Sequence, residues 1–186
     1  MHAVTERETV VLSRDCKALF VPIGIQVNAK KGTEVSILQQ LGGSYTVLLE
    51  GQMARIDAKD ADALGKTRVP LPAESYTGAV TAESVEQLVW QHLRTCYDPE
   101  IPVDIVELGL IYGCDVRETG KQRYRVEVKM TLTAPGCGMG DVLAEDVKEK
   151  LLAIPGVSDA DVELVLDPPW TVDMMSEAAR LQTGMM

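Results

Sequence analysis

The sequence predicts an α+β fold in which a two-layer domain follows a small all-β module. In the second half, hydrophobic residues recur first at helical spacing and then in strand-like alternation, in the order helix–strand–strand–helix–strand. In the first half, several short alternating segments are separated by turns that contain glycine or proline. We therefore expect a β module over residues 1–66, a linker over 67–80, and an α+β domain with a C-terminal tail over 81–186.

The composition excludes several classes of partner. The chain has 186 residues, a formal net charge of −10 and a pI near 4.7. This charge argues against non-specific binding to nucleic acid and against docking on anionic membranes. No apolar stretch approaches the ~18 residues of a membrane helix, and the N-terminus lacks a basic-then-apolar signal pattern. We expect a cytoplasmic protein that binds other proteins or a small ligand.

The β module is predicted from paired strands. Residues 33–39 and 44–50 alternate in hydrophobicity, and Gly42-Gly43 between them is typical of a hairpin. Several such short strands suggest a small barrel of the SH3-like type. The aspartates between positions 57 and 62 invite a calcium interpretation, but the EF-hand glycine and terminal glutamate are missing. A solvated acidic turn is the favoured interpretation.

The α+β domain begins with Thr81, a good N-cap, and its first helix should end at Asp98-Pro99. A first strand is predicted over residues 108–116, and a second over 124–133 alternates cleanly. We expect a helix capped by Asp141 to follow, then a third strand over 162–166. One-sided burial predicts an antiparallel three-stranded sheet with helices on one face. The first strand should present these residues on one face: Leu108, Leu110, Tyr112, Cys114 and Val116.

A glycine-rich loop around Cys137 is the leading candidate for a functional site. Gly136 and Gly138 flank the cysteine and allow close approach to a ligand. The following helix presents unpaired N–H groups and a positive dipole end, both of which lower a thiol pKa. The glycine spacing fits neither a dinucleotide loop nor a P-loop. A buried structural cysteine is the alternative, and the glycine neighbours argue against it.

Four further residues are candidates for the same site. Asp98 and Glu100 flank Pro99 in a rigid loop, where helix termination with solvated side chains is an equally good interpretation. Thr131 and Thr133 are predicted on the open face that leads to the cysteine loop, and strand propensity alone also explains them. Carboxylates would raise the pKa of a nearby thiol, which hinders a nucleophile but suits an iron site with oxygen and sulfur ligands.

The remaining cysteines and histidines are weaker candidates. Cys96 and Cys114 fall on apolar faces, so core packing is expected for both. No C-x-x-C motif occurs, which argues against a zinc ribbon or a thioredoxin-type site. His2 lies at the terminus and His92 is expected at the edge of the first helix. Cysteine–histidine catalysis therefore has little support.

Long motifs in the chain resemble the PaaD-like family of iron–sulfur assembly domains in its SufT form. Residues 98–112 resemble the first signature of the family, and residues 131–137 resemble its cysteine loop. Residues 167–170 and 174–184 resemble its C-terminal signature. The N-terminal extension of the SufT form is resembled by residues 32–35, 41–47 and 60–65.

This resemblance implies a non-enzymatic accessory factor in iron–sulfur protein maturation, centred on Cys137, with Asp98 and Glu100 in the same signature. The implied cofactor is a transient iron–sulfur cluster, and the implied partners are scaffold or carrier proteins and apo-target proteins. Clusters usually have about four protein ligands, so one thiolate would have to share a cluster with a donor or with a second copy of the chain. Two alternatives stay open: an adaptor that carries no cluster, and a thiol enzyme with Cys137 as nucleophile.

Overall fold

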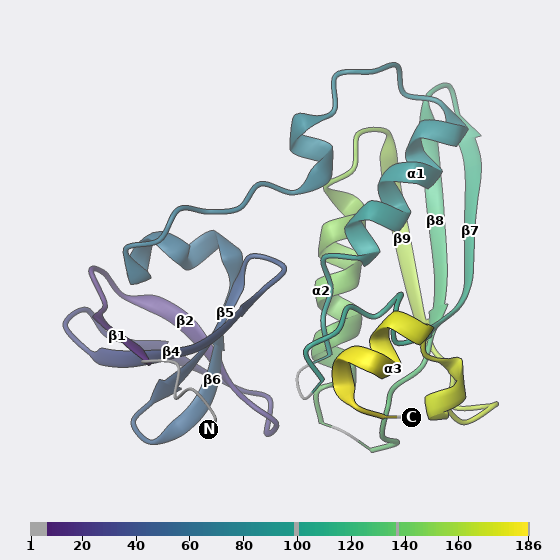
Figure 1. The fold of residues 1–186 in the computed structure, drawn as a ribbon. Helices are drawn as coiled ribbons and strands as arrows, with labels where there is room; N and C mark the ends of the chain where they lie inside the picture. The colour runs from purple at the N-terminus through teal and green to yellow at the C-terminus, as the bar shows by residue number, and fades with distance from the viewer. Residues whose placement is uncertain (1–6, 99–100, 137, 186) are drawn as a thin grey trace. The chain divides into compact units, whose positions relative to one another are not determined.

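A computed structural model describes residues 7–98, 101–136 and 138–185. The chain divides into two compact units, Met1–Val69 and Pro70–Met186, which are described separately below (Figure 1). The first unit is all β, as the sequence predicts, and the second combines helices with a sheet.

The N-terminal unit is a six-stranded antiparallel sheet with the strand order β1-β4-β5-β6-β2-β3. The predicted hairpin joins β4 to β5, and Gly42 and Gly43 at its turn both have positive φ angles, which glycine tolerates best. One face of the sheet encloses an aliphatic core that includes Val47 and Ile56. The strands are β1 (Glu8–Val11), β2 (Cys16–Phe20), β3 (Ile25–Ala29), β4 (Glu34–Leu41), β5 (Ser44–Leu49) and β6 (Gln52–Ile56).

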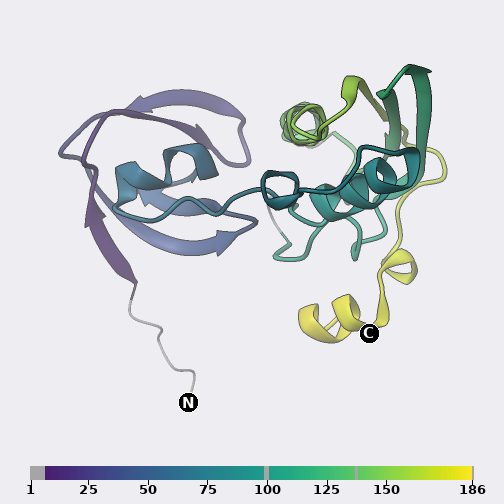
Figure 2. The same cartoon turned by 90° about the horizontal axis from the view of Figure 1, so that it is seen from above.

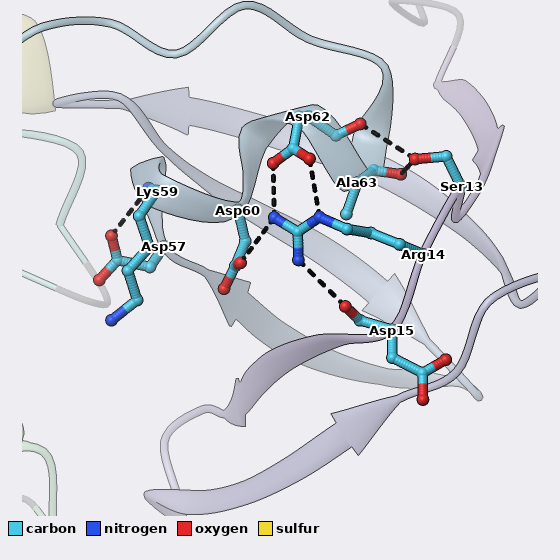
Figure 3. Close-up of polar contacts among 8 residues, drawn as sticks. All are labelled: Ser13, Arg14, Asp15, Asp57, Lys59, Asp60, Asp62 and Ala63. Carbon is cyan, nitrogen blue, oxygen red and sulfur yellow. Dashed lines mark hydrogen bonds and ion pairs between the residues drawn. The ribbon is translucent and has the colours of Figure 1, made fainter.

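The acidic turn of this unit is paired with the guanidinium group of Arg14. The turn forms a 3-10 helix, η1 (Ala58–Leu64), that follows β6. Arg14 donates from Nε to Asp62 Oδ2 at 2.7 Å and from Nη2 to Asp60 Oδ1 at 2.9 Å (Figure 3). The hydrogen bond from Arg14 lowers the pKa of Asp62. These carboxylates are therefore paired rather than merely solvated, and they are engaged by a guanidinium rather than offered to calcium.

The C-terminal unit has the predicted order helix–strand–strand–helix–strand (Figure 1). Its sheet has the order β7-β8-β9, with β7 antiparallel to β8 and β9 parallel to β8. The prediction of a wholly antiparallel sheet is therefore wrong for the third strand. Helix α2 forms a crossover between β8 and β9, which returns the chain to the end at which β8 begins. The elements are α1 (Ala82–Leu93), β7 (Ile111–Gly120), β8 (Arg123–Met130), α2 (Gly140–Leu152), β9 (Val157–Leu164) and α3 (Glu177–Thr183).

The core of this unit lies between the sheet and the two longer helices. Helix α1 contacts β7 and α2 contacts β9, and the helices also contact each other (Figures 1 and 2). Val126, Val128 and Met130 of β8 are buried, as the alternation predicts, while Arg125, Glu127 and Lys129 between and beside them are partly or fully exposed. Burial of each large aliphatic side chain contributes about 1.5–3 kcal/mol.

A β-bulge at Tyr112 changes the predicted face of β7. Ile111 pairs with Met130 and Gly113 pairs with Lys129, so Tyr112 is the extra residue. Cys114 packs against the core as predicted, but Tyr112 turns aside and donates its hydroxyl to the Pro168 carbonyl at 2.7 Å. Leu108 and Leu110 are buried in the turn that precedes the strand rather than within it.

His92 is fully buried, with 0% of its surface exposed, so its predicted place at a helix edge is wrong. The Ala73 N–H donates to Nε2 at 3.0 Å, and Nδ1 lies 2.7 Å from the Lys150 carbonyl oxygen. Because a backbone N–H can only donate, the neutral ring carries its proton on Nδ1. Ala73 belongs to a 3-10 helix, η2 (Pro72–Ser75). Part of the predicted linker therefore packs into the core of this unit.

Candidate functional site

The predicted site residues that the structure describes lie on two segments, one after α1 and one after β8, that a hydrogen bond brings together. Cys137 and Glu100 lie outside the described residues. Gly136 is exposed, has a φ angle of +81° and faces open space, so the chain at this point needs glycine. Gly138 is also exposed. The helix α2 then starts at Gly140, and its N-cap, Met139, makes no side-chain capping bond, so the predicted cap at Asp141 is wrong.

A hydrogen bond joins the two loops. Asp98 follows α1 and is only 7% exposed, and its Oδ2 accepts from the Thr133 hydroxyl at 3.2 Å. Its Oδ1 accepts from the Ile101 N–H at 3.1 Å. Thr133 lies between the end of β8 and the glycine-rich loop. The structure thus brings together two predicted site residues that are 35 positions apart in the chain.

Thr131 does not lie on the open face where the sequence placed it. Its surface is 1% exposed, and its N–H donates to the Leu110 carbonyl at 2.8 Å. The strand β8 ends at Met130, so the alternation that predicted the open face no longer applies one residue later. Thr131 is therefore part of the interior, where it anchors the start of the loop that carries Thr133.

Asp104 is a structural element of the site that the sequence reasoning missed. Its Oδ1 accepts from the N–H groups of Val106 and Glu107, both at 3.0 Å. Burial is the main reason that the pKa of Asp104 is raised. Asp104 also forms an antiparallel bridge with Tyr97, so it closes the base of the loop that carries Asp98. An aspartate that accepts from the N–H groups two and three residues ahead is a recognised turn motif, and this signal was available in the sequence.

The C-terminal tail braces the other side of this loop. We call residues 168–182 the C-terminal brace. Trp170 Nε1 donates to the Leu108 carbonyl at 2.7 Å, and the Ser176 N–H donates to the Glu107 carbonyl at 2.9 Å. Gly109 has a φ angle of +72°, and a Cβ there would lie 2.1 Å from the Met174 carbonyl oxygen. The brace therefore approaches the loop backbone more closely than any residue with a side chain would allow.

The three cysteines that the structure describes are poorly suited to thiolate chemistry. Cys16 and Cys96 are buried and Cys114 is half-buried. Burial raises the pKa of Cys16, and it raises the pKa of Cys114 to about 11. These two thiols stay protonated at neutral pH, whereas ligation and nucleophilic attack need the thiolate. Cys96 directs its sulfur to the His92 carbonyl at 3.6 Å.

The described residues do not form a closed metal site. Within residues 7–98, 101–136 and 138–185, no three side chains of histidine, cysteine, aspartate or glutamate are grouped to hold a metal ion. A metal at this site would therefore need ligands from Cys137 or Glu100, or from another protein. In the same part of the chain, no helix has the length and apolar character that a membrane crossing requires.

The C-terminal unit, a small α+β domain, has counterparts among known proteins. A sequence model described as "Iron-sulfur cluster assembly protein" matches residues 86–164. A Porphyromonas gingivalis protein named "Fe-S protein maturation auxiliary factor" is 46% identical over 99 residues, which cover 53% of this chain and 90% of that protein. The chain therefore belongs to the iron–sulfur cluster assembly protein family, and the resemblance predicted from its motifs is confirmed.

Two further known proteins match part of this chain. The Staphylococcus aureus "Fe-S protein maturation auxiliary factor SufT" is 45% identical over 87 residues, covering 47% of this chain and 94% of that protein. A crystal structure of a domain of unknown function (DUF59) from Bacillus anthracis is 34% identical with a TM-score of 0.51, covering 59% of this chain and 100% of that one. The residues that the family model matches lie in the C-terminal unit.

Proposed function

We propose that this protein is an accessory factor in iron–sulfur protein maturation that receives a cluster transiently at the Cys137 loop and passes it to an apo-target protein. The relatives named as maturation auxiliary factors support the general role. The hydrogen bond between Asp98 and Thr133 is the observation that carries the assignment to this site. It holds a carboxylate from the first signature against the segment that leads into the cysteine loop.

The donor set suits a cluster that is cargo rather than a permanent cofactor. Cys137 supplies one soft thiolate once its proton is lost, and Asp98 and Glu100 supply hard carboxylate oxygens. About four ligands usually hold a cluster, so the protein that donates the cluster or the protein that accepts it must supply the others. Asp98 is kept in place by two hydrogen-bond donors. A site with few ligands of its own releases its cargo readily, as a transfer role requires.

A thiol enzyme receives less support from the geometry. A nucleophilic cysteine is commonly activated by a base within hydrogen-bond reach. Both ring nitrogens of His92 are already engaged, by the Ala73 N–H and the Lys150 carbonyl. His2 lies outside the described residues. An adaptor without a cluster remains the competing role, and the first experiment below separates it from cluster transfer.

The central test is anaerobic reconstitution with iron and sulfide, followed by incubation with an apo iron–sulfur protein. We expect visible absorption of a cluster that appears on this protein and then moves to the acceptor. Cys137→Ser should abolish both signals, while Cys114→Ser, the matched control, should keep them. If the native protein takes up no cluster but still binds the acceptor, the adaptor role is correct and cluster transfer is refuted.

A second test addresses Asp98. Its carboxylate should raise the pKa of the Cys137 thiol by charge repulsion while contributing to iron binding. Asp98→Asn should therefore speed the alkylation of Cys137 by iodoacetamide and reduce iron uptake. Glu86→Gln, which removes a carboxylate from the exposed face of α1, is the control for charge alone. If Asp98→Asn slows alkylation, or leaves both measurements unchanged, Asp98 is not part of the site.

A further inference from the structure

We propose that the outer edge of β9 and the adjacent face of α2 form a docking groove for an extended, lysine- or arginine-containing segment of a partner protein. We call this surface the β9 groove and define it by Asp141, Glu145 and Lys148 of α2 and by Asp161, Val162 and Leu164 of β9. The inference rests on the proposed function in one respect, since it takes that partner to be an apo-target protein.

The first observation is the free edge of the sheet. The strand β9 lies at one end of the order β7-β8-β9 and pairs only with β8. In a parallel pair, alternate residues of each strand direct their backbone groups at the other strand. The Val165 N–H donates to the Met130 carbonyl at 2.9 Å, so residues 160, 162 and 164 direct theirs outward. Among the described residues, none pairs with these outward groups. Such an edge can accept an added strand.

The second observation is a hollow beside this edge with an excess of negative charge. A cavity of about 370 Å³ is lined by Asp141, Glu145 and Lys148 from the helix and by Asp161 and Val162 from the strand. Two carboxylates of the helix, Asp141 and Glu145, therefore face one ammonium group, and Asp161 adds a further negative charge at the edge of the strand. Within the part of the chain that the structure describes, none of these four charged groups has an ion-pair partner. The groove thus offers uncompensated negative charge to a basic segment.

The charge also argues against a second copy of this chain as the occupant. The whole chain carries a net charge of −10. Two β9 edges placed side by side would set aspartates against aspartates, because Asp159 and Asp161 both face solvent. Acidic edge strands resist pairing with themselves for this reason. A partner rich in lysine or arginine gains where a second copy would be repelled.

The strand geometry specifies the side-chain pattern of the partner. Successive side chains of β9 alternate, so Val162 and Leu164 face the helix side while Asp161 and Glu163 face the opposite side. A paired strand would place alternate residues on the helix side, where lysine stems can lie against Val162 and Leu164 while their ammonium groups reach Asp141 and Glu145 on α2. The groove also starts at the first turn of α2, whose first residue is Gly140. A segment bound in the groove would therefore lie beside the N-terminal end of α2, the helix that follows Cys137 in the chain.

The test uses a capped peptide of alternating lysine and valine, about six residues long, which is the usual length of a strand. The full chain is titrated with the peptide, and backbone amide exchange is followed residue by residue. We expect slower exchange at Val162 and Leu164, whose N–H groups point outward. Exchange at Asp161 and Glu163 should change little, because their N–H groups already bond to β8. The same peptide should not bind when the amides that would face β9 carry N-methyl groups, because those groups block the hydrogen bonds to the strand.

Two charge reversals provide the matched comparison. Glu145→Lys in the groove should weaken peptide binding about tenfold, corresponding to about 1.4 kcal/mol. Glu86→Lys, on the exposed face of α1 in the same unit, changes the net charge equally and should leave the affinity within about twofold. Equal losses in both variants would mean that net charge alone attracts the peptide, and the groove would be refuted. Absence of protection at Val162 and Leu164 would refute strand addition.

The outcome is independent of the cysteine chemistry. Cys137→Ser should bind the peptide as well as the native protein does, because the groove does not include that residue. If the peptide binds but no cluster is transferred, the proposed function fails and the groove stands. If clusters are transferred while the peptide leaves β9 unprotected, the groove fails and the proposed function stands.

Discussion

Acidification should destabilise the C-terminal unit through His92, because the folded protein holds this imidazole neutral and buried. Its Nε2 accepts the Ala73 N–H and its Nδ1–H bonds to the Lys150 carbonyl. Protonation would put a hydrogen on Nε2 and break the contact with Ala73. Burial is the main cause of the lowered pKa of His92. The hydrogen bond to the Lys150 carbonyl and the charge of Glu74 oppose this shift, and the positive charge of Lys150 adds to it.

The sign and size of the effect follow from proton linkage. The ordinary pKa of the side chain is 6.5, so the unfolded chain binds a proton below that pH while the folded chain does not. The stability is fully present above pH 6.5 and is lost as the pH falls from there towards the lowered folded pKa. When the pH falls from about 7.5 to about 5.5, the unfolded chain gains a proton at this group and a folded ring that stays neutral does not. The free energy of unfolding then decreases by about 1.4 kcal/mol.

The assay is urea unfolding of the native protein and His92→Gln at these two pH values, monitored by tryptophan fluorescence. Glutamine keeps one amide donor and one acceptor but does not titrate, so the variant should lose most of the pH dependence. Its stability at the higher pH should be lower, because its shape fits the site less well. If both proteins lose the same free energy on acidification, His92 is not the group responsible.

Three further outcomes test other parts of the structure. Cys114→Ser should lower stability by about 1–3 kcal/mol in urea unfolding while sparing cluster uptake; unchanged stability would contradict its place against the core. Gly109→Ala should lower the unfolding free energy by about 2 kcal/mol or more and expose the C-terminal brace to trypsin at Arg180. A brace that stays protected would show that the contact with Met174 is not required. Arg14→Met should lower the melting temperature of the N-terminal unit at neutral pH and have less effect as the pH falls towards the lowered pKa of Asp62, where the stabilising ion pair is lost.

The hydrophobic pattern predicted which elements form but could not predict every direction or register. The alternation in β8 is set by burial of one face, so it was readable from the sequence. The same pattern occurs in a parallel or an antiparallel strand, and the parallel pairing of β9 depends on the crossover through α2. The bulge at Tyr112 shifts the register by one residue, which a strict period of two cannot represent.

The candidate site was predictable in its parts rather than in its assembly. Asp98 and Thr133 were identified by residue type and loop context, but their contact depends on how the fold places the end of the first helix relative to the end of β8. Thr131 was misplaced because the strand ends one residue before it. His92 was misjudged because its partners, Ala73 and Lys150, are 19 and 58 positions away, and helical spacing alone gives no sign of them.

The C-terminal brace sets the order in which the site can be completed during synthesis. The bonds from Trp170 to Leu108 and from Gln182 to Pro102 join residues that are 62 and 80 positions apart. Chains emerge from the ribosome N-terminus first, so α1, the Asp98 loop and the hairpin can form before these partners exist. The loop gains its final support only when the last part of the C-terminal unit has been made. A nascent or truncated chain that ends before the brace would therefore present a folded sheet with an unsupported Asp98 loop.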